Sequence, residues 1–121
     1  MQINSTNKMD NQLIFNGILV HATGLLEDMR KDQTSYRYME ILVKADDGSG
    51  QSIHLKLTGE LAVQLDSCDR PPTSELRLYL RLYAFDSVDQ TTGSVMKCNS
   101  IRCWKIEVLD KKGESVFVCK N

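Results

Sequence analysis

The stretch LRLYLRLYAF at positions 76–85 alternates aliphatic residues with arginines and aromatic residues, one by one. Side chains of an extended strand point alternately to its two faces, so each kind of residue would occupy one face. The predicted core face consists of Leu76, Leu78, Leu80, Leu82 and Ala84. The predicted outer face consists of Arg77, Tyr79, Arg81, Tyr83 and Phe85. The stretch therefore predicts a half-buried β-strand.

The outer face of this predicted strand has two interpretations. A guanidinium group binds phosphate and an aromatic ring stacks on a nucleotide base, so the row has the chemistry of a single-stranded nucleic-acid platform. Tyrosine and phenylalanine also favour strands for structural reasons, and arginine and aromatic residues are enriched where subunits meet. The sequence leaves open whether the row binds nucleic acid or another subunit.

Length and composition indicate one soluble domain. The chain has 121 residues, of which 41% are hydrophobic and 26% charged, as is usual for a globular protein. Residues 1–11 are polar and lack the apolar segment of a secretory signal, so we expect a flexible arm and a cytoplasmic location, with no membrane contact. The predicted organisation is this arm, a domain over residues 12–110, and a turn with a short terminal strand over residues 111–121.

The net charge limits how nucleic acid could bind. Lysine and arginine together number 15 and aspartate and glutamate 16, which gives a formal charge of −1. The chain therefore lacks the overall positive field of a strongly basic nucleic-acid-binding protein. Any such binding must come from a local basic patch.

The cysteines and the remaining polar residues predict neither a metal site nor an enzyme. The four cysteines lack the paired Cys-x-x-Cys spacing of common zinc modules, and Cys98 and Cys103 would face opposite sides of a regular strand. A bulge between them would weaken that argument. No phosphate-binding loop or Gly-x-Ser-x-Gly nucleophile motif occurs, and glycines explain Asp46 and Asp47 as turn residues. We expect free, partly buried thiols, no cofactor and no catalysis.

The other segments predict a small barrel. Residues 13–26 read as a long strand bent at Gly17 and Gly24, residues 36–45 and 52–58 as a hairpin, residues 59–68 as a short helix, and residues 95–109 as a further strand. Trp104 shares its parity with Ile106 and Val108 and is predicted to lie in the core or at its edge. This order of elements predicts an all-β fold with one short helix, a five-stranded Greek-key OB-fold barrel.

Three segments also resemble a known family. QLIFNGIL at positions 12–19, LTGELA at 57–62 and WKIEVLD at 104–110 are similar, in this order, to the bacterial single-stranded DNA-binding proteins and their relative primosomal replication protein N. The resemblance covers about residues 12–110, and the order of the segments carries it. It implies an OB-fold that binds single-stranded DNA and assembles as a homodimer or homotetramer. The chain ends FVCKN, without the long linker and acidic tip of full-length members, so we expect an accessory replication or recombination protein.

The candidate binding residues share the outward parity of three predicted strands, those over residues 36–45, 52–58 and 76–85. In an OB-fold the second and third strands form much of the oligonucleotide surface. The nucleic-acid-binding candidates are Tyr36, Tyr38, Lys44, His54, Lys56, Arg77, Tyr79, Arg81, Tyr83 and Phe85. They predict largely sequence-nonspecific binding of single-stranded DNA, or alternatively RNA. Two other classes remain open: an OB-fold protein-interaction or assembly module without nucleic-acid binding, and a small-molecule-binding barrel.

Overall fold

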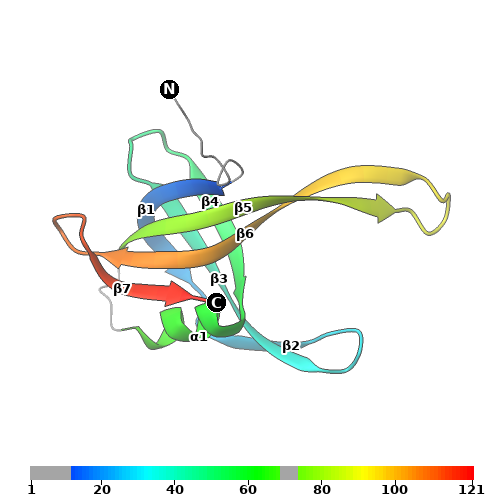
Figure 1. Ribbon diagram of the computed structural model, residues 1–121, viewed down its shortest axis with the longest axis horizontal. Helices are drawn as coiled ribbons and strands as arrows, with labels where there is room; N and C mark the ends of the chain where they lie inside the picture. The colour runs from blue at the N-terminus through cyan, green and yellow to red at the C-terminus, as the bar shows by residue number, and fades with distance from the viewer. Residues whose placement is uncertain (1–11, 69–73) are drawn as a thin grey trace.

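The computed structural model describes residues 12–68 and 74–121, so the expected N-terminal arm lies outside the described residues. One curled antiparallel sheet forms a half-barrel around a single short helix (Figure 1). The elements are β1 (Gln12–Ala22), β2 (Leu26–Met29), β3 (Ser35–Ala45), β4 (Ser52–Thr58), α1 (Gly59–Ser67), β5 (Glu75–Val88), β6 (Val95–Leu109) and β7 (Ser115–Lys120). The mostly β fold with one helix is confirmed, whereas the predicted count of five strands is wrong: the sheet has seven.

Strand β1 bends because it belongs to two ladders. Gly17 pairs with Ala45 of β3 and also with Leu76 of β5, so the strand changes partner at this residue. A Cβ atom at Gly17 would overlap the carbonyl oxygen of Lys44 and would lie 2.8 Å from Cγ1 of Val43. Glycine is required here by the close approach of two backbones, which lets the sheet curl.

Two strands lie outside the five of the predicted barrel: β2, and β7, which corresponds to the predicted short terminal strand. The first strand was predicted over residues 13–26 but ends at Ala22. After residues 23–25, where Gly24 adopts a φ of +78°, β2 runs alongside β3 almost wholly beyond the predicted strand. Strand β7 pairs with β6 beyond the turn at residues 110–114. The sheet order is β2-β3-β1-β5-β6-β7, with β4 paired to the other edge of β3. Strands β4 and β6 are therefore not neighbours in the hydrogen-bonded order.

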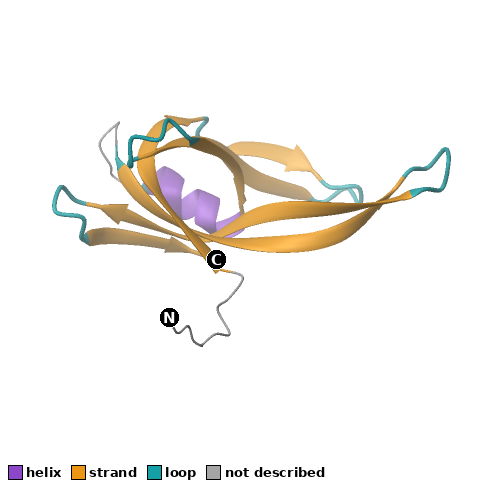
Figure 2. Cartoon of the chain, turned by 90° about the horizontal axis from the view of Figure 1, so that it is seen from above, coloured by secondary structure: helices purple, strands orange, loops and turns teal. Residues whose placement is uncertain are grey.

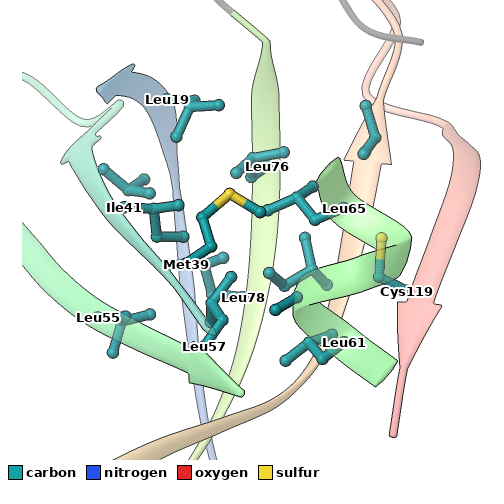
Figure 3. Close-up of a cluster of buried hydrophobic side chains, with 14 of the residues drawn as sticks. Leu19, Met39, Ile41, Leu55, Leu57, Leu61, Leu65, Leu76, Leu78 and Cys119 are labelled. Atoms are coloured by element: carbon teal, nitrogen blue, oxygen red, sulfur yellow. The ribbon is translucent and has the colours of Figure 1, made fainter. Parts of the chain in front are cut away.

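The core fills the concave side of the sheet. Met39 and Ile41 of β3 pack with Leu57 of β4 and with Leu76 and Leu78 of β5, and all five are fully buried (Figure 3). In each of these strands the buried residues occupy every second position, as the two-residue period of β structure requires. The predicted core leucines Leu76, Leu78 and Leu80 are confirmed.

Helix α1 lies inside the curl of the sheet and contributes Leu61, Ala62 and Leu65 to the core (Figure 2). The side chain of Asn121 accepts the backbone N–H of Leu61 at 2.9 Å, which satisfies one of the unpaired donors at the helix start. The backbone N–H of Lys120 donates to the side-chain oxygen of Gln64 at 2.8 Å. Two hydrogen bonds thus join β7 and its following residue to α1. In the described ranges no helix is both long and apolar enough to cross a membrane.

The predicted burial of Leu82 and Ala84 is wrong. Leu82 is 41% exposed and Ala84 is exposed, although the alternation along β5 continues. The paired strands β5 and β6 run past the barrel as a two-stranded ribbon over residues 82–101, which we call the β5–β6 ribbon (Figures 1 and 2). Leu82 and Ala84 lie on the same face of β5 as the core leucines, but this part of the face extends beyond the core.

The predicted position of Trp104 is also wrong, because β6 contains a bulge. Tyr79 pairs with Lys105 and Leu80 pairs with Cys103, so Trp104 has no partner on β5. The extra residue reverses the parity of β6 on one side of the bulge. The Trp104 ring therefore lies on the outer face, with its centroid 5.8 Å from that of Tyr79.

The thiols of Cys98 and Cys103 behave as expected, whereas Cys119 is fully buried. Cys98 and Cys103 are free and partly buried, and no register shift separates them. Cys98 pairs with Phe85 and Cys103 with Leu80, so the two lie on opposite faces of β6. Burial raises the pKa of the Cys103 thiol to about 12, which keeps this thiol protonated and unreactive at neutral pH.

Candidate nucleic-acid interface

A groove of about 1140 Å³ lies where β4 and β6 fail to pair, and we call it the β4–β6 groove. Most of its lining comes from three segments: residues 29–31 at and after the end of β2, residues 53–56 and 58 of β4, and residues 99–104 of β6. Tyr36, Tyr83 and Asn121 complete the described lining. The β2–β3 hairpin and the β5–β6 ribbon project toward the same side of the barrel (Figure 1). The open edge of the half-barrel is thus extended by two arms.

The lining of the groove is positively charged. Its basic side chains are Arg30, Lys31, Lys56 and Arg102, and no aspartate or glutamate is among the described lining residues. The whole chain carries a formal charge of −1, so positive charge is concentrated at this edge. Ile53 and Ile101 add apolar surface between the charges. A groove with this pattern suits a ligand that is anionic on one side and apolar on the other.

The β3–β4 wall carries an aromatic cluster covered by cations. The Lys56 ammonium group donates to the Tyr36 hydroxyl at 2.8 Å and lies 4.5 Å from the ring centroid of Tyr38. The guanidinium carbon of Arg30 lies 4.9 Å from the centroid of Tyr36. The hydrogen bond to Tyr36 raises the pKa of Lys56, so its charge persists at any physiological pH. Two rings and two cations are held together at one end of the groove.

Acidic residues approach the groove without lining it: Asp28 acts on Lys56, Asp32 acts on Arg30, and Glu40 contacts His54. The Nε2 atom of His54 lies 2.9 Å from Oε1 of Glu40, which sits on the neighbouring strand β3. Both side chains are partly exposed, with 61% of His54 and 38% of Glu40 accessible. Glu40 offsets any positive charge that His54 acquires on protonation, so His54 contributes less to the anion-binding character than Lys56 does.

The outer face of β5 and β6 carries a second row of stacked cations. The guanidinium carbon of Arg81 lies 4.7 Å from the centroid of Trp104, and that of Arg102 lies 5.2 Å from Tyr83. The Lys105 ammonium group lies 4.7 Å from the centroid of Tyr79. Cation–π contacts of this kind hold long basic side chains against the sheet. The row adjoins the groove through Arg102, Tyr83 and Trp104, which belong to both surfaces.

The barrel end of this outer row is closed by a polar network. Glu107 accepts hydrogen bonds from the Tyr79 hydroxyl at 2.6 Å and from the Arg77 guanidinium at 3.0 Å, and Arg77 also donates to Asn16 at 3.3 Å. These donors lower the pKa of Glu107, with the Tyr79 hydroxyl as the larger cause, and the same bond raises the pKa of Tyr79. Arg77 and the Tyr79 hydroxyl are thus engaged within the protein.

Glu107→Gln should weaken the fold at neutral pH and flatten its acid dependence. Because the folded pKa of Glu107 lies below its unfolded value, its contribution is present above pH about 4.5 and is lost as pH falls through the folded pKa. We expect a loss of about 1 kcal/mol at pH 7, which is less than a fully buried hydrogen bond to a charged group contributes, because Glu107 and Arg77 keep some solvent contact. Thermal melts at pH 7 and pH 3 measure this. Equal sensitivity to acid in both proteins would contradict it.

The structure distributes the predicted binding residues over several places. Tyr36, His54, Lys56 and Tyr83 line the groove, and Tyr38 adjoins it under Lys56. Arg81, Tyr79 and Arg77 lie on the outer face of β5 and do not line the groove. Lys44 is exposed on β3 opposite Ser52, and Phe85 borders a hollow of about 360 Å³ on the ribbon, beside Asp86 and Lys97. The ten candidates therefore do not form one continuous surface.

Among the basic and aromatic residues that line the groove, four were not candidates: Arg30, Lys31, Arg102 and Trp104. Arg30 and Lys31 are adjacent basic residues in a connection between strands, which is a signal that the sequence does contain. Arg102 shares its sequence parity with Trp104 and Ile106, so alternation predicted it on the core side, and it faces outward opposite Arg81 because the bulge lies between it and Ile106. Trp104 gave no signal, because its position depends on a bulge that alternation alone does not reveal.

The groove thus combines four cations, three aromatic rings and apolar surface between two arms of the sheet. Stacked rings can take the faces of bases, and the flanking cations can take phosphates. No family model and no curated protein matches the chain.

Proposed function

We propose that the protein is an OB-type barrel that binds single-stranded nucleic acid, mainly DNA. Binding has little sequence preference, and the protein catalyses no reaction. The observation that carries the proposal is the β4–β6 groove. Its lining, within residues 12–68 and 74–121, has four basic side chains and no carboxylate side chain, in a chain of net charge −1. A near-neutral protein gains electrostatic attraction for phosphates by such local concentration.

The OB-type assignment rests on connectivity. Strand β1 is bent and pairs with both β3 and β5, and α1 connects β4 to β5. If β1 and β2 are taken as two halves of one bent strand and β7 as an addition, five strands remain in the OB order. In OB-folds the ligand lies across the second and third strands, between the loops that follow the first and fourth strands. Residues 29–31 and the β5–β6 ribbon occupy the equivalent places here.

In this proposal the aromatic rings bind the bases and the basic side chains bind the phosphates. Tyr36, Tyr83 and Trp104 offer ring faces, and each stacked base contributes on the order of 1 to 3 kcal/mol whatever its identity. Lys56 and Arg102 neutralise phosphates and release condensed counterions. Since every base has a ring face and every nucleotide a phosphate, this arrangement predicts affinity with little discrimination. The resemblance to single-stranded DNA-binding proteins and primosomal replication protein N points to an accessory role in replication or recombination, as a homodimer or homotetramer.

A second candidate function is a protein-interaction or assembly module. The β5–β6 ribbon favours it, because Phe85 is 50% exposed, Val95 57% and Met96 67%. A two-stranded ribbon is marginally stable by itself, and exposed apolar side chains are common where another chain binds. The two functions use different parts of the chain, since none of these three residues lines the β4–β6 groove.

Titration of labelled oligo-dT, followed by fluorescence anisotropy, tests the nucleic-acid proposal. Trp104 is the only tryptophan and lines the groove, so we expect its emission to change on binding. With four phosphate contacts on a single strand, affinity should fall roughly 50-fold between about 50 and 200 mM salt. A duplex of equal length serves as the control and should bind more weakly, because its bases cannot stack on the rings. No binding of oligo-dT at 50 mM salt would refute the proposal.

A further inference from the structure

Two arginines lie directly opposite each other on the outer face of the sheet. Arg81 of β5 pairs with Arg102 of β6, and the next rung beyond the bulge places Lys105 opposite Tyr79. Like charges directly across a strand pair destabilise it. Among the described residues, the ion pairs formed by side chains include none of these three cations. Lys105 still acts on a carboxylate, because it contributes to the lowered pKa of Glu107. The fold therefore keeps Arg81 and Arg102 together without an ion-pair partner among the described residues, with Lys105 beside them.

The rings beside these cations hold them in place. Arg81 stacks on Trp104, Arg102 on Tyr83 and Lys105 on Tyr79, at 4.7 to 5.2 Å from the ring centroids. A stacked guanidinium group presents its N–H donors in the plane of the group, where they fit the oxygens of a phosphate. An anion between Arg81 and Arg102 would remove their mutual repulsion and use donors that the protein leaves available.

We propose that Arg81 and Arg102, with Lys105 beside them, form a phosphate clamp for a polynucleotide strand that leaves the β4–β6 groove. This inference rests on the proposed function and extends its site. Arg102 and Trp104 line the groove, whereas Arg81 and Lys105 do not, so the clamp begins at the groove border and continues on the outer face of β5 and β6. The occupant is the phosphodiester backbone of the same strand. A strand that is too short to leave the groove gains nothing from the clamp.

Arg81→Gln tests the clamp with two lengths of oligo-dT, about 5 and about 15 nucleotides, near the limits of the range for one OB-fold. We expect the variant to lose about tenfold in affinity for the longer strand and less than twofold for the shorter one. The salt dependence for the longer strand should fall by about one phosphate contact. Lys112→Gln removes the same charge from an exposed turn and should leave both affinities unchanged.

The melting temperature separates binding from folding. Because Arg81→Gln removes a like-charge pair, we expect the variant to melt at the same temperature as the unaltered protein or higher. An equal loss of affinity for both lengths would mean that Arg81 belongs to the groove. No loss of affinity for either length would mean that Arg81 binds no phosphate. Either result would overturn the clamp. A third result would also overturn the clamp: Arg81→Gln weakens the binding of inorganic polyphosphate but leaves the ratio of the affinities for the two oligo-dT lengths unchanged. Failure of the unaltered protein to bind either strand would overturn the proposed function, and the clamp with it.

Discussion

Lys56→Glu should lower the affinity for oligo-dT by roughly 100-fold at low salt, about 2.7 kcal/mol of binding free energy. Lys56 lines the groove beside Tyr36 and Tyr38, so charge reversal removes one attraction for a bound phosphate and introduces one repulsion. It also releases the Tyr36 hydroxyl from its hydrogen bond. Anisotropy titrations at two salt concentrations measure the loss, which should shrink as salt screens the repulsion.

Lys44→Glu is the matched charge reversal on the neighbouring strand. Lys44 is exposed but does not line the groove, so we expect a loss of about threefold or less from the general field. Lys56→Gln, which avoids a second carboxylate opposite Glu40, should fall between the two and melt near the unaltered protein. Equal losses for Lys44→Glu and Lys56→Glu would mean that overall charge, rather than the groove, governs binding.

Gly17→Ala should destabilise the fold by about 3 kcal/mol or more, at the upper end of the cost of overpacking. The new Cβ would overlap the carbonyl oxygen of Lys44, and Val43 stands 2.8 Å away. The backbone of β3 cannot move aside without disturbing its ladder with β4. Denaturant unfolding measures the loss of stability, and a larger side chain such as that of Gly17→Val should prevent folding.

Gly93→Ala provides the comparison for Gly17. Gly93 has a φ of +75° in the turn of the β5–β6 ribbon, and no atom lies within 4 Å of a Cβ placed there. Its replacement should cost about 1 kcal/mol through backbone strain alone. If Gly17→Ala were no more harmful than Gly93→Ala, the close approach of β1 and β3 would not be a determinant of the fold.

The sequence alone located most of the elements. The predicted strands over residues 52–58 and 95–109 coincide with β4 and β6, and the helix expected over residues 59–68 is α1 (Gly59–Ser67). Alternation, helical spacing and glycine-rich turns are local properties, so they can be read without the fold. The sequence likewise predicted the opposite faces of Cys98 and Cys103, since no bulge lies between them.

The errors share a physical cause. Leu82 has the parity of a core residue, but burial depends on what lies opposite, and at that point β5 and β6 have passed the end of the barrel. Trp104 shares its sequence parity with Ile106, but one unpaired residue in β6 places the indole on the outer face. Strand length beyond the core and bulges are properties of paired strands.

The sequence by itself determined most of the strands other than β2, which faces of β3 and β4 point outward, and which side chains carry charge or rings. Only the tertiary structure decided which of these meet. Arg30, Lys56 and Arg102 come from three separate segments, and the curl of the sheet brings them to one groove because β4 and β6 remain unpaired. The alternation of a strand fixes the direction of its side chains, whereas register, bulges and curvature fix their neighbours.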